Sequence, residues 1–145
     1  MTQHLQNQHE GEECIFCKII SGEVSAIKVY EDNEILAFMD LYPNHPGHTL
    51  VVPKDHVENI YGMPAETAAR LMVAVQKIAV AVKNAVDADG LNLVMNNESA
   101  AGQAVWHAHM HIIPRFNEDG GYVGKKHTYI TGEMEEIAEK IRQEL

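Results

Sequence analysis

The sequence predicts an α+β domain built on an antiparallel sheet. Segments typical of β-strands follow one another along the chain, and one long amphipathic helix is inserted among them. Alternating strand–helix–strand units, which would indicate a parallel sheet, are absent from the sequence. A length of 145 residues suits one domain with a single hydrophobic core. We therefore expect a five-stranded antiparallel sheet with one long helix and short N- and C-terminal helices.

The first half of the domain is expected to begin with a helix and to continue with three strands. The sequence predicts a helix over 14–23, strands over 26–32, 34–40 and 49–52, and a loop over 41–48. Gly22 favours the end of the helix, because glycine adopts the left-handed conformation of a helix C-terminus without steric cost. The first two strands are typical of a hairpin. Pro53, which lacks a backbone donor, is expected to end the third strand.

One long helix is expected over 63–86. Pro64 fits its first turn, where the missing N–H would be unpaired in any case, and Glu66 favours the positive end of the helix dipole. Four apolar residues recur at helical spacing and predict a stripe that faces the sheet. They are Leu71, Val75, Ile78 and Val82. Gly90 follows the expected end of this helix.

The rest of the chain is expected to form two strands and a closing helix. The sequence predicts a fourth strand over 91–97, a loop of small residues over 98–103, a fifth strand over 104–114 that ends at Pro114, and a helix over 131–145. Thr131 is expected to cap that helix, and its early acidic and late basic residues suit the helix dipole.

The charge balance excludes several classes of partner. The chain has 21 acidic and 11 basic residues and a formal net charge of −10, and its densest basic segment is GKKH at 124–127. A protein that binds the nucleic-acid backbone needs a basic surface, so we expect no nucleic-acid partner. No apolar run reaches the roughly 20 residues of a membrane span, so we expect no membrane partner. Residues 1–13 lack the apolar segment of a signal peptide, which predicts a flexible tail and a cytoplasmic protein.

The two cysteines, Cys14 and Cys17, form a Cys-x-x-Cys pair. With one possible disulfide and no secretory signal, a disulfide scaffold is not expected. Two interpretations of the pair remain. The cysteines are either two small buried residues at the start of a helix, or half of a zinc site that takes its other ligands from elsewhere in the chain.

Three histidines stand at every second position of the expected fifth strand. Because side chains alternate between the two faces of a strand, His107, His109 and His111 would project from one face, and Trp106 and Met110 would pack beneath the long helix on the other. The outer two histidines would stand about 13 Å apart, at roughly 3.3 Å per residue. That separation disfavours one metal ion bound by all three through bonds of about 2 Å. A buried cluster of three mutually hydrogen-bonded imidazoles is also disfavoured, because it needs a large polar network.

A nucleophile with supporting groups explains the pattern better. Neutral imidazole attacks electrophiles near neutral pH, and a hydrogen bond at one ring nitrogen fixes which nitrogen attacks. The neighbouring histidines would donate hydrogen bonds to developing charge. Gly102 in the preceding loop lets the backbone approach a phosphate closely. The pattern therefore indicates attack on the phosphorus of a small phosphate ester or amide, without a catalytic metal.

The same stretch resembles a known family. Residues 107–113 (HAHMHII) match the His-x-His-x-His-x-x pattern, with apolar spacers, of the histidine triad (HIT) superfamily. Further segments in the family's order are CIFCKIISGE, VYEDNEILAFMDLYP, GHTLVVPKDH, NLVMNN and AGQAVWHAHMHIIPR. Residues 14–145 therefore resemble an HIT domain, similar to the bacterial Hit and Hint-like branch.

The resemblance implies an HIT-like fold and a hydrolase or transferase that acts on purine nucleotides with an AMP or GMP moiety. In the family, the middle histidine attacks the α-phosphate of a phosphoramidate or phosphoester and forms a nucleotidyl-histidine, which water cleaves. Carried over, His109 is the nucleophile, and His111 is the second catalytic residue, which contacts the phosphate oxygens. The other implied substrate-binding residues are Asp40 and Leu41 at the ribose and base, Asn96 at the ribose–phosphate, Gly102, Gln103, Ala104 and Val105 at the phosphate, and His48 behind the triad.

Zinc and a homodimer also follow from the resemblance. Some HIT proteins, and the related galactose-phosphate uridylyltransferases, hold a structural zinc ion with a Cys-x-x-Cys pair and two histidines. The matching residues here are Cys14, Cys17, His56 and His107, a set that suits a closed tetrahedral site. Family members dimerise into a continuous ten-stranded sheet, and the alanine- and valine-rich helix segment 70–82 is apolar enough to bury more than one face.

Two positions bear on the choice of substrate. Many Hint-like proteins have serine at the position of Ala104, where its hydroxyl helps the leaving group, so the alanine makes phosphoramidate cleavage less favoured. The segment IIPR, which ends at Arg115, partly resembles the dinucleoside polyphosphate hydrolases. The alternative for Arg115 is a surface salt bridge. The alternatives to the leading function are a dinucleoside polyphosphate hydrolase, a non-catalytic nucleotide-binding adaptor, and a metal-dependent hydrolase that uses the histidines as ligands.

Overall fold

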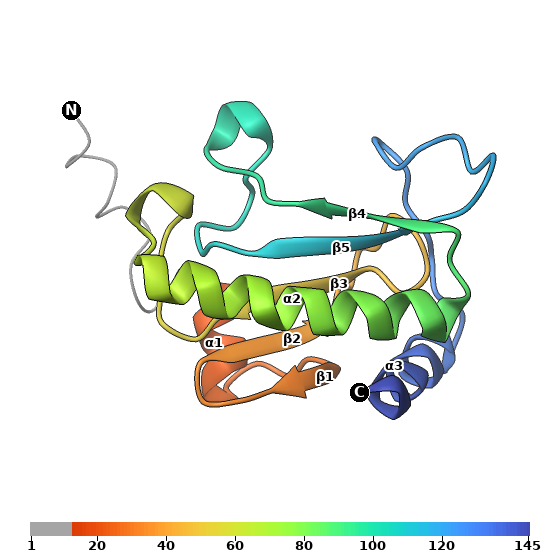
Figure 1. Ribbon diagram of the computed structural model, residues 1–145, viewed down its shortest axis with the longest axis horizontal. Helices are drawn as coiled ribbons and strands as arrows, with labels where there is room; N and C mark the ends of the chain where they lie inside the picture. The colour runs from red at the N-terminus through yellow and green to blue at the C-terminus, as the bar shows by residue number, and fades with distance from the viewer. Residues whose placement is uncertain (1–12) are drawn as a thin grey trace.

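The computed structural model describes residues 13–145, so the tail expected over 1–13 lies, apart from Glu13, outside the described residues. The helices are α1 (Ile15–Ser21), α2 (Ala65–Val86) and α3 (Glu133–Glu144), and the strands are β1 (Lys28–Glu31), β2 (Ile35–Met39), β3 (Thr49–Pro53), β4 (Gly90–Val94) and β5 (Met110–Arg115). The strands form one antiparallel sheet in the order β1-β2-β3-β5-β4 (Figure 1). The predicted α+β fold, with one long helix and two shorter terminal helices, is confirmed.

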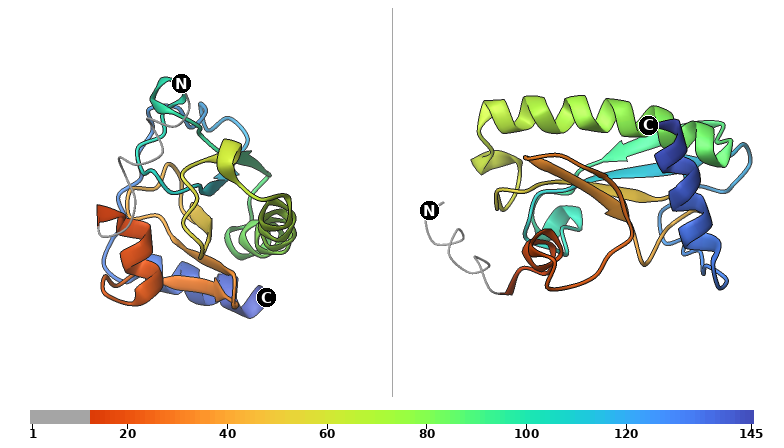
Figure 2. Two further views of the ribbon diagram at one scale, coloured as in Figure 1. Left: turned by 90° about the vertical axis from the view of Figure 1, so that its left-hand side faces the viewer. Right: turned by 90° about the horizontal axis from the view of Figure 1, so that it is seen from below.

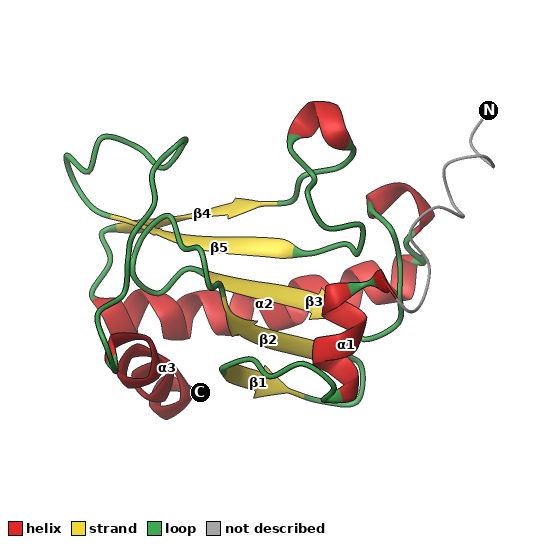
Figure 3. Ribbon diagram, turned by 180° about the vertical axis from the view of Figure 1, so that it is seen from behind, coloured by secondary structure: helices red, strands yellow, loops and turns green. Residues whose placement is uncertain are grey.

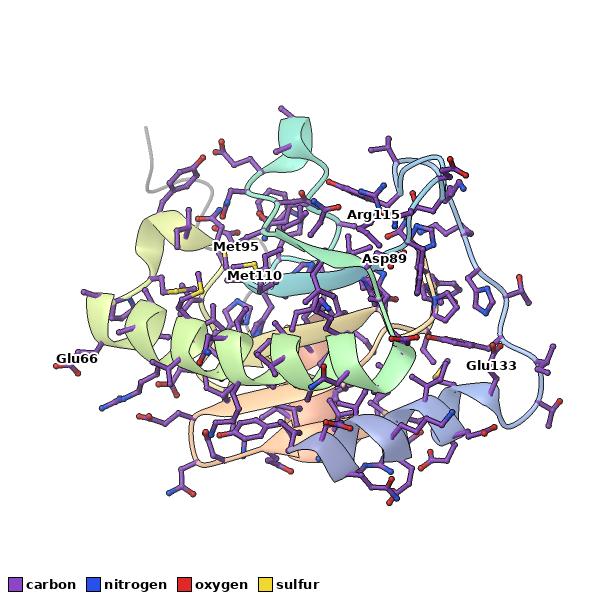
Figure 4. All side chains as sticks on the ribbon, turned by 45° about the vertical axis from the view of Figure 1, so that its right-hand side comes forward. Glu66, Asp89, Met95, Met110, Arg115 and Glu133 are labelled. Carbon is purple, nitrogen blue, oxygen red and sulfur yellow. The ribbon has the colours of Figure 1, made fainter. Side chains whose placement is uncertain are left out.

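Helix α2 covers one face of the sheet (Figure 1). All four residues of its predicted apolar stripe are buried there, in one cluster with Met39, Val51 and Ile112 of the strands. Glu66 lies in the first turn of α2 and points away from the sheet (Figure 4). Burial of this stripe removes the apolar side chains of both elements from water, which is the main favourable contribution to folding.

Helix α1 lies across the opposite face of the sheet (Figure 2, right). Gly22, with a φ of 85°, ends α1 as predicted. Every residue of β2 and β3 is buried, because these central strands are covered on both faces. The second core cluster consists of Cys14, Phe16, Ile19, Leu36, Phe38, Leu50 and Val52. No helix within residues 13–145 combines the length and the apolar composition that crossing a bilayer requires.

The fifth strand differs from the prediction. It covers Met110–Arg115 instead of 104–114, so that Pro114 lies inside the strand and does not end it. The proline is tolerated because β3 pairs only with residues 110–112 of β5, and β3 therefore lacks a hydrogen bond to the position of Pro114. The part of the histidine motif before Met110 consequently lies outside the sheet.

Two predicted element ends also change. Thr131 does not cap α3, because Gly132, with a φ of 86°, is the N-cap residue. No side chain among residues 13–145 caps α3; the Glu133 carboxylate accepts the N–H of Ile130 at 3.1 Å, which ties the first helical residue to the chain before it. Pro53 is the last residue of β3 rather than the first residue beyond it.

The 41–48 loop is fixed against the end of α2. Gly47 has a φ of 91°, and a Cβ at this position would lie 2.8 Å from Cγ1 of Val86, so no other residue fits without displacement. The N–H of Gly47 donates to the hydroxyl of Tyr129 at 2.9 Å. These contacts determine where the next residue, His48, is placed.

Candidate active site

The candidate site lies on the sheet face away from α2, the face seen in Figure 3 with α1 lying across part of it. The expectation that three histidines project from one strand is wrong, because only His111 belongs to β5, where it pairs with Leu50. The chain before it bends away from the sheet, and the N–H of Ala108 donates to the carbonyl of Val57 at 2.7 Å. The rings of His109 and His111 nevertheless lie 4.8 Å apart, so the bend keeps the two imidazoles together.

The hydrogen bond of His109 determines which of its nitrogens is free. Its Nδ1 lies 2.7 Å from the carbonyl oxygen of His107. Because a carbonyl only accepts, Nδ1 carries the proton and Nε2 keeps a lone pair. The ring is 6% exposed and stands edge-on to Phe16, with centroids 5.0 Å apart. Burial lowers the pKa of His109, while the His107 carbonyl and the Asp40 charge oppose that shift.

A similar argument assigns the protons of His48 and His111. The N–H of Asn44 donates to His48 Nδ1 at 3.0 Å, so the proton of neutral His48 lies on Nε2. That nitrogen is 2.9 Å from His111 Nδ1, which must accept the bond. The proton of His111 therefore lies on Nε2, where it is available to a ligand. The chain Asn44–His48–His111 thus makes His111 a hydrogen-bond donor.

Both of these imidazoles are neutral at physiological pH. Burial lowers the pKa of His48 to about 4, although the Asp40 carboxylate opposes the shift. Burial also lowers the pKa of His111 to about 3, helped by the nearby His109 and His48. The 3.4 Å approach of Asp40 Oδ2 to His48 Nε2 is therefore a contact with a neutral ring and not an ion pair.

Asp40 and Leu41 lie at the mouth of the site. Asp40 Oδ1 accepts the N–H of Tyr42 at 2.8 Å, and its other oxygen faces His48. Leu41 is 64% exposed, so its side chain is available to an apolar ligand surface. The structure thus places the Asp40 carboxylate, the group implied at the ribose, in contact with His48, which is hydrogen-bonded to His111.

The 98–105 loop offers fewer free donors than expected. The N–H groups of Gly102 and Gln103 donate within the loop, to Ser99 and to Glu98. The Gln103 side chain is also committed, because it bonds to Glu98, Glu58 and Val105. Among the described residues, no hydrogen bond uses the N–H groups of Ala104 and Val105. Asn96 lies beside Gly102, with Nδ2 3.8 Å from where a Cβ of Gly102 would lie.

A second group of side chains meets at the N-terminus of α1. It consists of Cys14, Cys17, His56 and His107, and their ligand atoms all lie within 4.8 Å of one another. His107 Nε2 donates to the carbonyl of Pro53 at 2.7 Å, so its Nδ1 lone pair faces the two cysteines. The sulfur-to-Nδ1 distances are 3.4 Å from Cys14 to His107, 3.5 Å from Cys17 to His107 and 3.3 Å from Cys17 to His56.

These distances fit a tetrahedral zinc ion. With Zn–S bonds of about 2.3 Å and Zn–N bonds of about 2.0–2.1 Å, sulfur and nitrogen ligands lie about 3.5 Å apart. Burial raises the pKa of Cys17 to about 12 in the absence of a cation, and a bound metal would deprotonate it. Asp40, His48 and His111 also lie close together, but both His48 nitrogens are already in hydrogen bonds.

Of three further side chains near the motif, Trp106 differs from the prediction, whereas Met110 and Arg115 have neighbours that the sequence suggested. Trp106 is not part of the core beneath α2 and lines a hollow next to Cys14 and Val105. Met110 does pack against that core, beside Met95 (Figure 4). Arg115 forms a two-pronged ion pair with Asp119, at 2.9 and 2.8 Å, which supports the salt-bridge interpretation.

Sequence reasoning missed two residues of the site. Phe16 packs edge-on against His109, and its place inside the cysteine motif was the available signal. Asn44 sets the proton position of His48 through its backbone N–H, and no side-chain pattern reveals a backbone contact.

Comparisons with known proteins agree with this fold. A family model described as "HIT domain" matches residues 21–118. The "Protein hit" of Bacillus subtilis is 45% identical over 141 residues, which covers 94% of this chain and 97% of that protein. "Adenylylsulfatase HINT3" of Arabidopsis thaliana is 41% identical over 107 residues, 74% of this chain and 54% of that protein. The crystal structure of a Zn-bound histidine triad family protein from Mycobacterium smegmatis is 37% identical, with a TM-score of 0.81, and covers 90% of this chain and 91% of that chain.

The proton positions of His48 and His111 predict their behaviour in acid. At pH 5 an imidazole with a pKa of about 6.5 is mostly protonated, whereas these two should remain neutral with the proton on Nε2. Because both pKa values are lowered, only the unfolded chain takes up these protons, and the free energy of unfolding should fall as pH drops from 6.5 towards 4. NMR of ¹⁵N-histidine protein at pH 5 measures the protonation and tautomer of each ring, with His111→Asn as the assignment control, and denaturant unfolding between pH 6.5 and 4 measures the free energy of unfolding. Cationic signals from both rings at pH 5 would contradict the assignment.

Proposed function

The chain belongs to the HIT domain family, and on that premise we propose that it cleaves purine nucleotides at the α-phosphate through a nucleotidyl-histidine intermediate. The substrates would be phosphoramidates or phosphoesters, and the family assignment supports a nucleotide-binding hydrolase or transferase. One observation carries the proposal. His109 has Nδ1 bound to a backbone carbonyl at 2.7 Å, which leaves Nε2 as a neutral nucleophile.

The reaction would proceed in two displacements. In the first, the lone pair of His109 Nε2 forms a bond to the α-phosphorus as the bond to the leaving group breaks. The leaving group departs with that electron pair and takes its proton from solvent. In the second, water adds to phosphorus, the N–P bond breaks, and the water's proton is released as His109 becomes neutral again. The bond from Nδ1–H to the His107 carbonyl persists and stabilises the positive ring of the intermediate.

Neutral donors would hold the phosphoryl oxygens. They are the Nε2–H of His111 and the free N–H groups of Ala104 and Val105. A well-placed donor of this kind contributes about 3 kcal/mol to transition-state stabilisation. With a pKa of about 3, His111 would act as a fixed donor and not as a source of protons.

The nucleoside would lie at the mouth of the site. Asp40 would accept hydrogen bonds from the ribose hydroxyls, the exposed Leu41 would cover one face of the base, and Asn96 would contact the ribose–phosphate. The similarity to a protein named adenylylsulfatase supports an adenylyl substrate. Ala104 has no hydroxyl to assist a departing amine, so leaving groups that depart as stable anions would be cleaved faster than amines.

We further propose one structural zinc ion per chain, held by Cys14, Cys17, His56 and His107. The ligand distances and the similarity to a Zn-bound histidine triad protein support this proposal. The ion would link the start of α1, through Cys14 and Cys17, to His107, whose carbonyl orients His109. It would make no contact with the substrate.

The protein is also proposed to be a homodimer. Strand β4 is one edge of the sheet, and Leu93 within it is 45% exposed. The outer face of α2 exposes Met72, Val73 and Val80. An edge strand that carries an exposed apolar residue, in a molecule whose helix α2 is also partly apolar outside, favours pairing with a second copy of the same chain.

The variant His109→Asn tests the proposed function. Asparagine keeps a polar side chain but removes the attacking nitrogen, so kcat should fall by several orders of magnitude while AMP affinity changes by less than about tenfold. Activity assays should use adenylyl sulfate, an adenylyl phosphoramidate and a dinucleoside polyphosphate, with His127→Asn as the control. Mass spectrometry of quenched wild-type protein should find the nucleotidyl group on His109. Near-normal turnover by His109→Asn, or nucleotide binding by the wild-type protein without turnover, would refute the mechanism.

Elemental analysis tests the zinc proposal. Protein purified without chelator should contain about one zinc ion per chain, and Cys17→Ser should lose most of the metal because a hydroxyl is a poor zinc ligand. The variant should also have a lower Tm, since metal binding is coupled to folding. His127→Asn, which alters a histidine outside the set, should keep its zinc. A fully stable zinc-free wild-type protein would rule out the structural role.

Light scattering at micromolar concentration tests the dimer. The wild-type protein should have twice the mass of one chain. Leu93→Lys should shift the protein towards the monomer, because it places charge beside the open edge of β4. Val123→Lys, which alters a residue that is 87% exposed and outside β4, is the matched control. A monomeric wild-type protein would contradict the proposal.

A further inference from the structure

The densest basic segment of the chain is attached to the loop that carries Asp40. The Asn44 side chain donates to the carbonyls of Tyr122 and Lys125, at 3.0 and 2.6 Å. The N–H of His127 donates to the carbonyl of Pro43 at 2.8 Å. The backbone on either side of Lys126 is thus hydrogen-bonded to the 41–48 loop. These bonds hold the Cα of Lys126 in place beside the candidate site.

The two adjacent lysines of this segment have different surroundings. The Lys125 ammonium donates to the carbonyl of Asp119. The Lys126 ammonium lies 3.4 Å from the carbonyl of Tyr42, and it forms no ion pair with a carboxylate of residues 13–145. In a chain with a net charge of −10, a lysine at the site without a carboxylate partner is available to an anionic ligand.

The position of Lys126 relates it to the ribose end of the site. Tyr42, whose carbonyl it contacts, donates its N–H to Asp40 Oδ1. The Lys126 charge is also one of the causes that lower the pKa of His48 and of His111, after burial. The free donors for the 5′-phosphate come instead from β5 and from residues 104–105.

We propose that Lys126 binds a second phosphate group, carried on the 2′ or 3′ oxygen of the nucleotide ribose. This inference rests on the proposed function, in which Asp40 holds the ribose. A phosphate on one of these oxygens leaves the other hydroxyl for Asp40. The ammonium then offsets the repulsion between that carboxylate and the added phosphate. The specificity of the site would therefore extend to nucleoside bisphosphates and their 5′-linked derivatives.

Calorimetric titration of the full-length protein tests this inference. The ligands are AMP, adenosine 2′,5′-bisphosphate, adenosine 3′,5′-bisphosphate and ADP, and the proteins are wild type, Lys126→Met and Lys125→Met. At least one bisphosphate should bind the wild-type protein about tenfold more tightly than AMP, as expected for a charge-assisted contact. Lys126→Met should lose this gain while AMP affinity stays within about twofold. Lys125→Met should retain it, and Lys126→Arg should restore most of it. Circular dichroism and Tm measurements establish that each variant is folded.

The outcomes separate this inference from the proposed function. If AMP binds the wild-type protein but neither bisphosphate binds more tightly, the inference is wrong and the proposed function stands. If the gain survives in Lys126→Met, or if Lys126→Met weakens ADP instead of the bisphosphates, Lys126 does not serve the ribose phosphate. If AMP itself fails to bind the folded wild-type protein, the proposed function fails and the inference fails with it.

Discussion

In each of the four central imidazoles, one ring nitrogen is hydrogen-bonded to a group that fixes which of the two nitrogens carries the proton. The carbonyls of Pro53 and His107 only accept, so they place the protons of His107 and His109. The N–H of Asn44 only donates, so it places the proton of His48 and, through that ring, the proton of His111. The result is a lone pair of His107 facing the cysteines, a lone pair on His109, and a hydrogen-bond donor on the neighbouring His111.

These backbone groups work only if the chain before β5 is held in one conformation. The Gln103 side chain fixes the preceding loop through three hydrogen bonds, and Ala108 is bonded to Val57. His107 then has two tasks. Its ring belongs to the proposed zinc site, and its carbonyl orients His109. An ion bound there would therefore stabilise the position of His109, the proposed nucleophile, without touching the substrate.

Burial decides how the site handles charge. The imidazoles of His48 and His111 are kept neutral because removal from water disfavours their charged forms. Such rings act as fixed dipoles and donors, which need no reorganisation when charge develops on a phosphoryl group. A neutral site also avoids adding to the unfavourable field of an acidic chain when an anionic nucleotide binds. Lys126, whose ammonium lies 3.4 Å from the carbonyl of Tyr42, is the positive charge that we propose for an added ribose phosphate.

The sequence by itself determined the elements whose signal is local. The apolar stripe of α2, the hairpin of β1 and β2, and the glycine that ends α1 all follow from the spacing of neighbouring residues. The motif order also indicated the family and a complete set of metal ligands. Only the tertiary structure decided where β5 begins, which nitrogen of each histidine is free, and which backbone N–H groups remain for a phosphate. The start of β5 depends on the distant contact of Ala108 with Val57, and the proton of His111 depends on the distant ring of His48. The protons of His48 and His109 depend on backbone groups of Asn44 and His107, whose directions are set only in the folded chain. The spacing of residues along the sequence does not predict which groups will be hydrogen-bonded to one another in the folded chain.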